Sequence, residues 1–164
     1  DLPRSAIRDV LLSDEGVRVL TDGPELSLEF GAVEAGRWQV ALLKKPPTLA
    51  EKLGISKTTP AFVLGEFDDE ALERALVGAT IEIAADAAIL LALLWEEADL
   101  MRASDLAVRH PTKHIWMVHR KEKTDSVSDT RERHHMRALG FIDSKTSGIS
   151  DQLTTTRYRL RADR

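Results

Sequence analysis

The segment of residues 113–161 constrains the fold most, because strand, charged loop, helix and strand follow one another there with little between them. An apolar strand over residues 114–118 runs directly into a basic loop that contains Arg120, Lys121 and Lys123. A polar helix and two further strand-like segments complete the succession. This order predicts an α/β sheet whose functional residues lie at the ends of its strands.

The last predicted helix begins at Ser128, whose hydroxyl is a typical N-cap, and ends at Gly140. Its expected inner face consists of His135, Met136 and Leu139. Lys145 follows within the next strand. If that strand runs antiparallel to residues 114–118, Lys145 lies beside the basic loop.

The segment before residue 113 also alternates strands with helices. We predict strands over residues 61–64, 81–83 and 87–94, and helices from an N-cap at Asp68 to Gly78 and over residues 96–110. The run from Ala87 to Leu94 is continuously apolar, as in a strand covered on both faces, although its Ala and Leu content leaves a buried helix as the alternative. These elements together predict a mostly parallel sheet.

Residues 1–46 differ, because short strands separated by turns dominate them. We expect a short helix over residues 6–12 and strands over residues 17–20, 26–30 and 38–43. Leu26, Leu28 and Phe30 alternate with polar residues, which indicates one buried and one solvated face. Pro46-Pro47 ends the unit. The prediction is an N-terminal antiparallel β appendage, residues 1–46, followed by an α/β domain, residues 47–164.

Motifs within residues 47–161 resemble a bacterial family of domains of unknown function, family 3052. The similar segments are residues 49–55 followed by a Val-Leu strand, residues 115–118 with Lys121 in the next loop, residues 138–145, and residues 150–158. The resemblance implies a small Rossmann-like domain, similar to a shortened S-adenosylmethionine-dependent methyltransferase. The family supplies no established activity.

The composition restricts the chemistry open to the chain. There is no cysteine, which excludes disulfides and thiolate metal sites and fits a cytoplasmic location. The longest apolar run, Ala87 to Trp95, is too short to cross a bilayer as a helix, so we expect no membrane association. The five histidines show no metal-binding spacing on a helix, and no Gly-x-Ser-x-Gly motif is present. We therefore predict neither a metal site nor a catalytic residue.

The turn after the first strand of the α/β domain is a poor cofactor site. A nucleotide or S-adenosylmethionine requires glycines there, because they let the backbone approach the ligand. Gly65 stands alone, followed by the segment Glu66-Phe67-Asp68-Asp69, whose acids repel phosphate and whose phenylalanine crowds a ligand. Glu82 or Asp86 could bind a ribose. We read Gly65 and Glu82 as parts of a degenerate cofactor site and expect no bound cofactor.

Charge separates along the sequence. Residues 1–100 hold 9 Lys and Arg against 19 Asp and Glu, whereas residues 101–164 hold 14 against 8. Such asymmetry indicates a docking face for an anionic partner, although acidic and basic surfaces that pack against each other also explain it. The candidate binding residues are Arg120, Lys121, Lys123, Lys145, Arg157 and Arg159.

The sequence favours a non-catalytic binding or regulatory module with a basic C-terminal face for an acidic protein. A small S-adenosylmethionine-dependent methyltransferase-like enzyme is the first alternative, and a nucleic-acid-binding accessory protein is the second. A continuous positive face joining Arg120, Arg137 and Arg159 would favour nucleic acid. Arginines scattered and paired with carboxylates would favour the module. Assembly into a homo-oligomer stays open.

Overall fold

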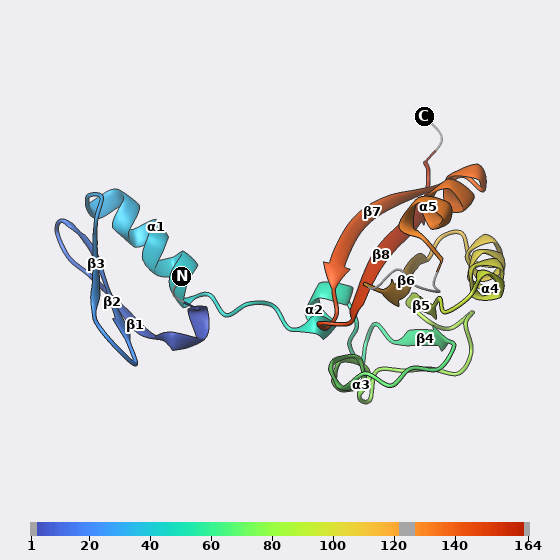
Figure 1. Cartoon of the computed structure of the whole chain (residues 1–164), viewed down its shortest axis with the longest axis horizontal. Coiled ribbons are helices and arrows are strands. Elements are labelled where there is room, and N and C mark those ends of the chain that lie inside the picture. The colour runs from blue at the N-terminus through green and yellow to red at the C-terminus, as the bar shows by residue number, and fades with distance from the viewer. Residues whose placement is uncertain (1–2, 122–126, 163–164) are drawn as a thin grey trace. The chain divides into compact units, whose positions relative to one another are not determined.

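The chain divides into two units at the proline pair, residues 1–46 and residues 47–164 (Figure 1). The computed structural model describes residues 3–121 and 127–162. The smaller unit is a three-stranded antiparallel sheet in the order β1-β2-β3, with one helix on it. Its elements are a 3-10 turn (Arg4–Ala6), β1 (Ile7–Leu12), β2 (Gly16–Thr21), β3 (Leu26–Glu29) and α1 (Ala32–Leu43).

Three predictions for the smaller unit are wrong. Leu26 and Leu28 were expected on a buried face of β3, but they are 41% and 39% exposed, and of the three residues only Phe30 packs on the core. Residues 6–12 were expected as a helix, but Ile7–Leu12 is a strand, and its Val10 is fully buried opposite Val19 of β2. Residues 38–43 were expected as a strand, but they belong to α1. The apolar run there serves a helix, because Ala35 and Leu42 lie seven residues apart and both pack on the sheet.

The larger unit is built around a five-stranded mixed sheet in the order β4-β5-β6-β8-β7. β4, β5 and β6 pair in parallel, and β8 pairs antiparallel with both β6 and β7, so β8 alone runs against the other four. Its elements are α2 (Leu49–Leu53), β4 (Ala61–Leu64), α3 (Glu70–Leu76), β5 (Ile89–Leu93), α4 (Glu97–Arg109), β6 (His114–Arg120), α5 (Asp129–Ala138), β7 (Phe141–Gly148) and β8 (Leu153–Leu160).

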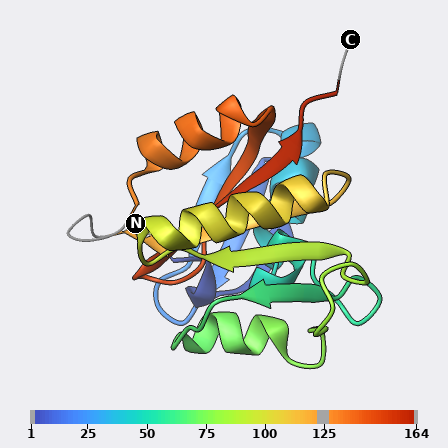
Figure 2. The ribbon, with the colours of Figure 1, turned by 90° about the vertical axis from the view of Figure 1, so that its right-hand side faces the viewer.

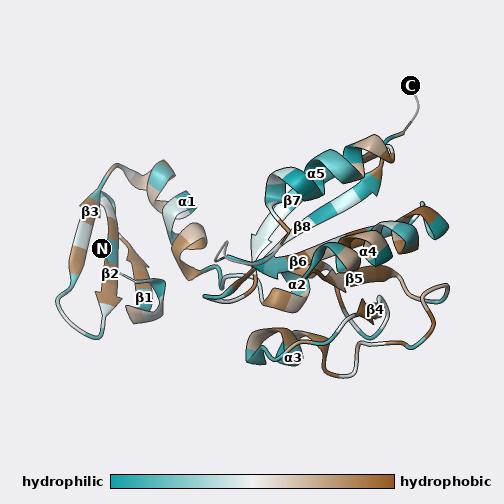
Figure 3. Ribbon diagram, turned by 45° about the vertical axis from the view of Figure 1, so that its right-hand side comes forward, coloured by the Kyte–Doolittle hydropathy of each residue, from teal (hydrophilic) through white to brown (hydrophobic). Residues whose placement is uncertain are grey.

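Helices cover both faces of the sheet, and Figure 2 shows α4 crossing the face turned toward the viewer. α4 and α5 contribute Leu100 and Met136 to the core on one face, whereas α2 and α3 contribute Leu53 and Leu72 to the core on the other. All five residues of β5 are buried, and Figure 3 shows this strand hydrophobic along its length. The strand predicted over residues 87–94 is therefore confirmed, and the alternative of a buried helix is wrong.

The connection from β4 to β5 departs from the prediction. α3 is capped by Asp69, whose side chain accepts a hydrogen bond from the Leu72 N–H, and not by Asp68. The helix ends at Leu76, before Gly78. The strand expected over residues 81–83 does not form: Thr80 makes one parallel bridge to Ala61, and the chain then leaves the sheet. Among the described residues, the outer edge of β4 is consequently paired only at its beginning.

The last helix begins as expected, since the Ser128 hydroxyl accepts a hydrogen bond from the Arg131 N–H. Its inner face agrees with the prediction at Met136, which is fully buried. It differs elsewhere, because Glu132 is buried, whereas Leu139 is 40% exposed. In the two described ranges, no helix combines the length and the hydropathy that a membrane crossing needs.

Candidate functional site

A hollow of about 560 Å³ lies at the carboxyl ends of the parallel strands, where open α/β sheets bind ligands. It is formed by the loop after β4, by Trp95 two residues after β5, by the last residue of β6, and by the beginning of β8 with the residue before it. The lining residues are Glu66, Phe67, Asp68, Asp69, Trp95, Arg120, Gln152 and Leu153. Gly65 starts the loop with a φ of 98°, and a Cβ there would lie 3.3 Å from the Cβ of Leu93, so the turn requires glycine.

Trp95 organises this hollow. Its indole N–H donates to the Glu66 carbonyl at 2.9 Å, which ties the loop after β4 to the end of β5. The guanidinium of Arg120 lies 5.0 Å from the centre of the indole ring, within cation–π range. The backbone N–H of Trp95 donates to the Asp99 carboxylate at 2.8 Å. Burial raises the pKa of Asp99, but the hydrogen bonds from Arg102 and from backbone N–H groups lower it by more than burial raises it. The pKa is therefore below its ordinary value, and the carboxylate stays ionised.

The hollow does not fit a nucleotide phosphate. Its loop presents carboxylates at Glu66, Asp68 and Asp69, which repel an anion. The side chain of Phe67 packs against the core on the α3 side. Glu82, the second part of the predicted cofactor site, lies in another groove at the outer edge of β4. Only Arg120 supplies a cation among the lining residues.

The other loop candidates serve different contacts. Lys121 donates from Nζ to the Ser150 carbonyl at 2.7 Å and from its backbone N–H to the Gln152 carbonyl at 2.8 Å. These bonds fix the end of β6 to the turn between β7 and β8. Lys123 lies outside the described residues.

Lys145, Arg157 and Arg159 form a separate group, which we call the basic sheet face. Lys145 of β7 and Arg157 of β8 are direct partners in the sheet register. Their charged ends lie 5.9 Å and 5.5 Å from the centre of the ring of Trp116, a fully buried residue of β6. Lys145 and Arg159 are exposed, and Arg157 is half-buried.

The structure does not place Lys145 beside the basic loop. That expectation required β7 to run antiparallel to β6, but β7 runs parallel to it because β8 is inserted between them. Arg120 pairs with Leu153, whereas Lys145 pairs with Arg157, four residues further along β8. The candidate residues therefore divide into two groups.

Four other arginines of the larger unit, Arg74, Arg102, Arg131 and Arg137, are paired with carboxylates. Arg131 contacts Glu97 at 2.6 Å, and Arg137 contacts Asp143 at 2.8 Å. Arg137 lies on α5, on the face of the sheet opposite to the basic sheet face. In the described part of the chain, Arg120, Arg137 and Arg159 do not join into one positive surface.

The sequence analysis missed a buried polar cluster beneath α5. His119 Nε2 lies 2.7 Å from the Asp129 carboxylate, and His119 Nδ1 lies 3.2 Å from that of Glu132. The side chains of His119 and Glu132 are 4% and 1% exposed. The Tyr158 hydroxyl is also buried. Burial and the nearby charge of Glu132 both raise the pKa of this hydroxyl. The only signal in the sequence was that Asp129 and Glu132 lie three residues apart on the helix after His119. Such a pair of acids is also typical of a solvent-exposed helix face.

Burial lowers the pKa of His119, but the contacts with Glu132 and Asp129 raise it more, so the folded-state pKa lies above the ordinary value. The imidazolium form therefore stabilises the attachment of α5 to the sheet.

Comparisons with protein-family models, with curated proteins and with solved structures find no match to this chain. Among the residues that the structure describes, no group of three or more His, Asp and Glu is placed to hold a metal ion.

We predict that the larger unit loses stability as the pH rises from about 6.5 through the raised pKa of His119, because a group with a raised folded-state pKa stabilises most when protonated. His119→Gln should abolish this dependence. Urea unfolding followed by tryptophan fluorescence measures it, in a Trp38→Phe background where Trp95 and Trp116 report on the larger unit alone. His134→Gln, an exposed change on α5, should keep the pH dependence. An unaltered pH profile in His119→Gln would contradict the prediction.

We also predict that S-adenosylmethionine does not bind with micromolar affinity, because Glu66, Phe67 and Asp68 replace the glycine-rich turn that its site requires. Isothermal titration calorimetry of the full chain measures this. A dissociation constant of about 1 μM or below, about −8.2 kcal/mol, would refute the prediction.

Proposed function

We propose that residues 47–161 form a non-catalytic binding module that docks an acidic protein segment on the basic sheet face. The observation that carries the proposal is the direct cross-strand pairing of Lys145 with Arg157. Like charges at opposed positions of a sheet destabilise it, so the pair has an electrostatic cost. A carboxylate bound between them would remove that cost, and the forked guanidinium of Arg157 is suited to bind one.

The surroundings of the pair support an anionic partner. Partial burial lowers the pKa of His114, and the charges of Arg157 and Arg159 lower it further, which indicates a positive potential at this end of the face. Arg159 is exposed two residues beyond Arg157 on the same side of β8. The basic sheet face therefore presents three cations from two neighbouring strands.

The form of the surface also supports binding of a protein segment. α2 reaches this face only as far as Trp116, whose indole N–H donates to the Leu53 carbonyl at 3.0 Å. The Nζ of Lys145 donates to the Lys52 carbonyl at 2.9 Å, which fixes the lysine at the border of α2. Beyond that border the outward side chains of β7 and β8 are accessible, so a partner meets prearranged charges.

The two alternatives receive less support. A methyltransferase-like enzyme agrees with the succession of parallel strands β4, β5 and β6 and with the family resemblance, but the acidic loop after Gly65 does not suit the cofactor. A nucleic-acid-binding role would require a longer positive surface than Lys145, Arg157 and Arg159 provide.

Charge reversal on the face tests the proposal. With a short oligoglutamate peptide as the probe, Lys145→Glu combined with Arg159→Glu should weaken binding at least tenfold, about 1.4 kcal/mol, because two exposed cations become anions. Arg74→Glu combined with Arg109→Glu changes the net charge equally on two helices and should leave affinity within about twofold. Fluorescence anisotropy of the labelled peptide measures both.

Three outcomes would contradict the proposal. Unchanged affinity in the Lys145 and Arg159 double variant would show that the peptide binds elsewhere. Loss of binding only in the triple variant Arg120→Glu, Lys121→Glu, Lys123→Glu would place the site at the carboxyl ends of the parallel strands. Tighter binding of a short DNA duplex than of oligoglutamate at the same salt concentration would favour the nucleic-acid alternative.

A further inference from the structure

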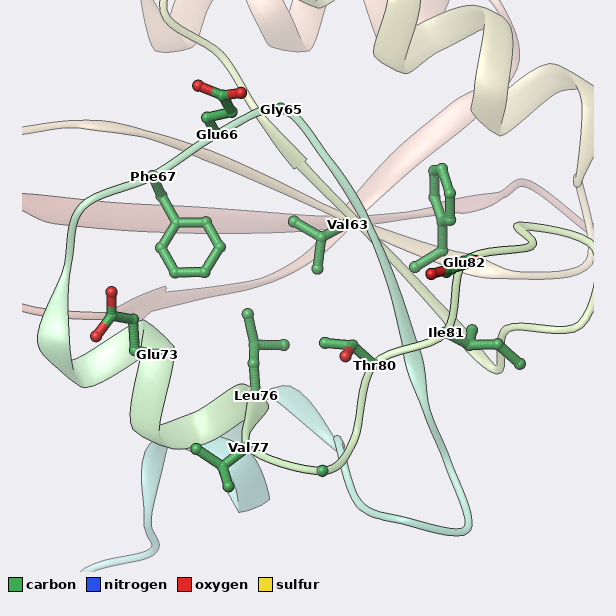
Figure 4. Close-up of a pocket in the computed structure, with 12 residues that line it drawn as sticks. Val63, Gly65, Glu66, Phe67, Glu73, Leu76, Val77, Thr80, Ile81 and Glu82 are labelled. Carbon is green, nitrogen blue, oxygen red and sulfur yellow. The ribbon is translucent and has the colours of Figure 1, made fainter.

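A groove of the larger unit follows the outer edge of β4 and is distinct from the basic sheet face (Figure 4). Its volume is about 1010 Å³. β4 ends the strand order, so one side of it pairs with β5 and the other side opens into the groove. The walls are the loop after β4, the helix α3, and the segment that leads away from Thr80.

Among the described residues, the outward backbone groups of β4 have hydrogen-bond partners at Ala61 and lack a strand partner at Val63. The Ala61 N–H donates outward to the Ala79 carbonyl at 2.8 Å, and the Ala61 carbonyl accepts from the Ile81 N–H at 3.0 Å. Because a parallel strand directs alternate residues to alternate neighbours, Val63 directs its N–H and carbonyl to the same outer side. The outer pairing ends at Ala61, so Val63 presents one donor and one acceptor to the groove.

The groove walls combine apolar surface with negative charge. Figure 4 shows the side chains of Val63, Phe67 and Leu76 converging on one side of the groove. Val77, at the end of α3, is 76% exposed. The carboxylates belong to Glu66, Glu73 and Glu82, and the groove-lining residues include no Lys or Arg.

We propose that an extended basic peptide segment, rich in β-branched residues and lysine, binds here by adding a strand to β4. Its backbone would pair with Val63 in the place that the chain vacates after Thr80. Its apolar side chains would cover Leu76 and Val77, and its lysines would reach the three carboxylates along apolar stems. The exposed edge of a sheet is a ready template for such pairing.

Charge selects this partner over a second copy of the chain. Two β4 strands paired edge to edge would bring Glu66, Glu73 and Glu82 of each copy to one shared groove. Like charges placed together in that way oppose association. A basic segment meets complementary charge instead.

The test uses a synthetic peptide of alternating valine and lysine and the full chain. Fluorescence anisotropy should show binding that weakens at least tenfold when alternate peptide nitrogens are methylated, because methylation removes donors and keeps every charge. Glu73→Lys combined with Glu82→Lys should weaken binding at least tenfold. Asp105→Lys combined with Asp151→Lys, an equal charge change at two exposed sites, should weaken it less than twofold.

Val63→Pro provides a second test at the backbone, because it removes the outward N–H and leaves the bonds to β5 in place. Equal affinity for the methylated and unmethylated peptides would overturn strand addition. Binding by the Glu73 and Glu82 double variant as tight as by the unaltered chain would also overturn the proposal. Self-association of the peptide-free chain in sedimentation velocity, abolished by Val63→Pro, would assign the groove to a second copy instead. None of these results depends on Lys145 or Arg159, so the proposal for the basic sheet face stands or fails separately.

Discussion

Burial of β5 and β6 between two helical layers is the interaction on which the rest of the larger unit depends. Leu90 and Ile115 face α4 and α5, while Leu91 and Trp116 face α2 and α3, and all four side chains are fully buried. Each large apolar side chain buried in this way contributes about 1.5–3 kcal/mol. The centre of the sheet is therefore filled by packing, and the surfaces available for binding lie at its periphery.

The charge asymmetry of the sequence becomes a spatial one in the larger unit. The acidic part of the sequence supplies the loop after β4 and the rim of the β4 groove, with Glu66, Glu73 and Glu82. The basic part supplies β7 and β8 at the opposite end of the strand order, with Lys145 and Arg157. The two proposed partners, one acidic and one basic, would therefore bind at opposite ends of the sheet.

The sequence allowed prediction of those features that depend on local chemistry or on continuous apolar runs. The buried strand β5 and the Ser128 cap are examples. The helix α1 was not predictable, because the apolar residues from Trp38 onward fit a strand equally well until the sheet that Ala35 covers is known.

The candidate site was predictable in its residue types more than in its arrangement. The grouping of Lys145 with Arg157 depends on β8 being inserted between β6 and β7, which is a property of the topology. The burial of His119 between Asp129 and Glu132 likewise follows from how α5 packs, and local sequence does not encode it.

In the part of the chain that the structure describes, the outer edge of β4 is unpaired beyond Ala61, and residue-resolved amide hydrogen exchange by NMR tests this most directly. Phe62 and Leu64 direct their N–H groups to β5, whereas Val63 directs its N–H to the groove. The amide of Val63 should therefore exchange at least about a hundredfold faster than those of its two neighbours, which share the protection of the core. Equal protection of all three amides would show that the edge is already paired and would contradict the open groove.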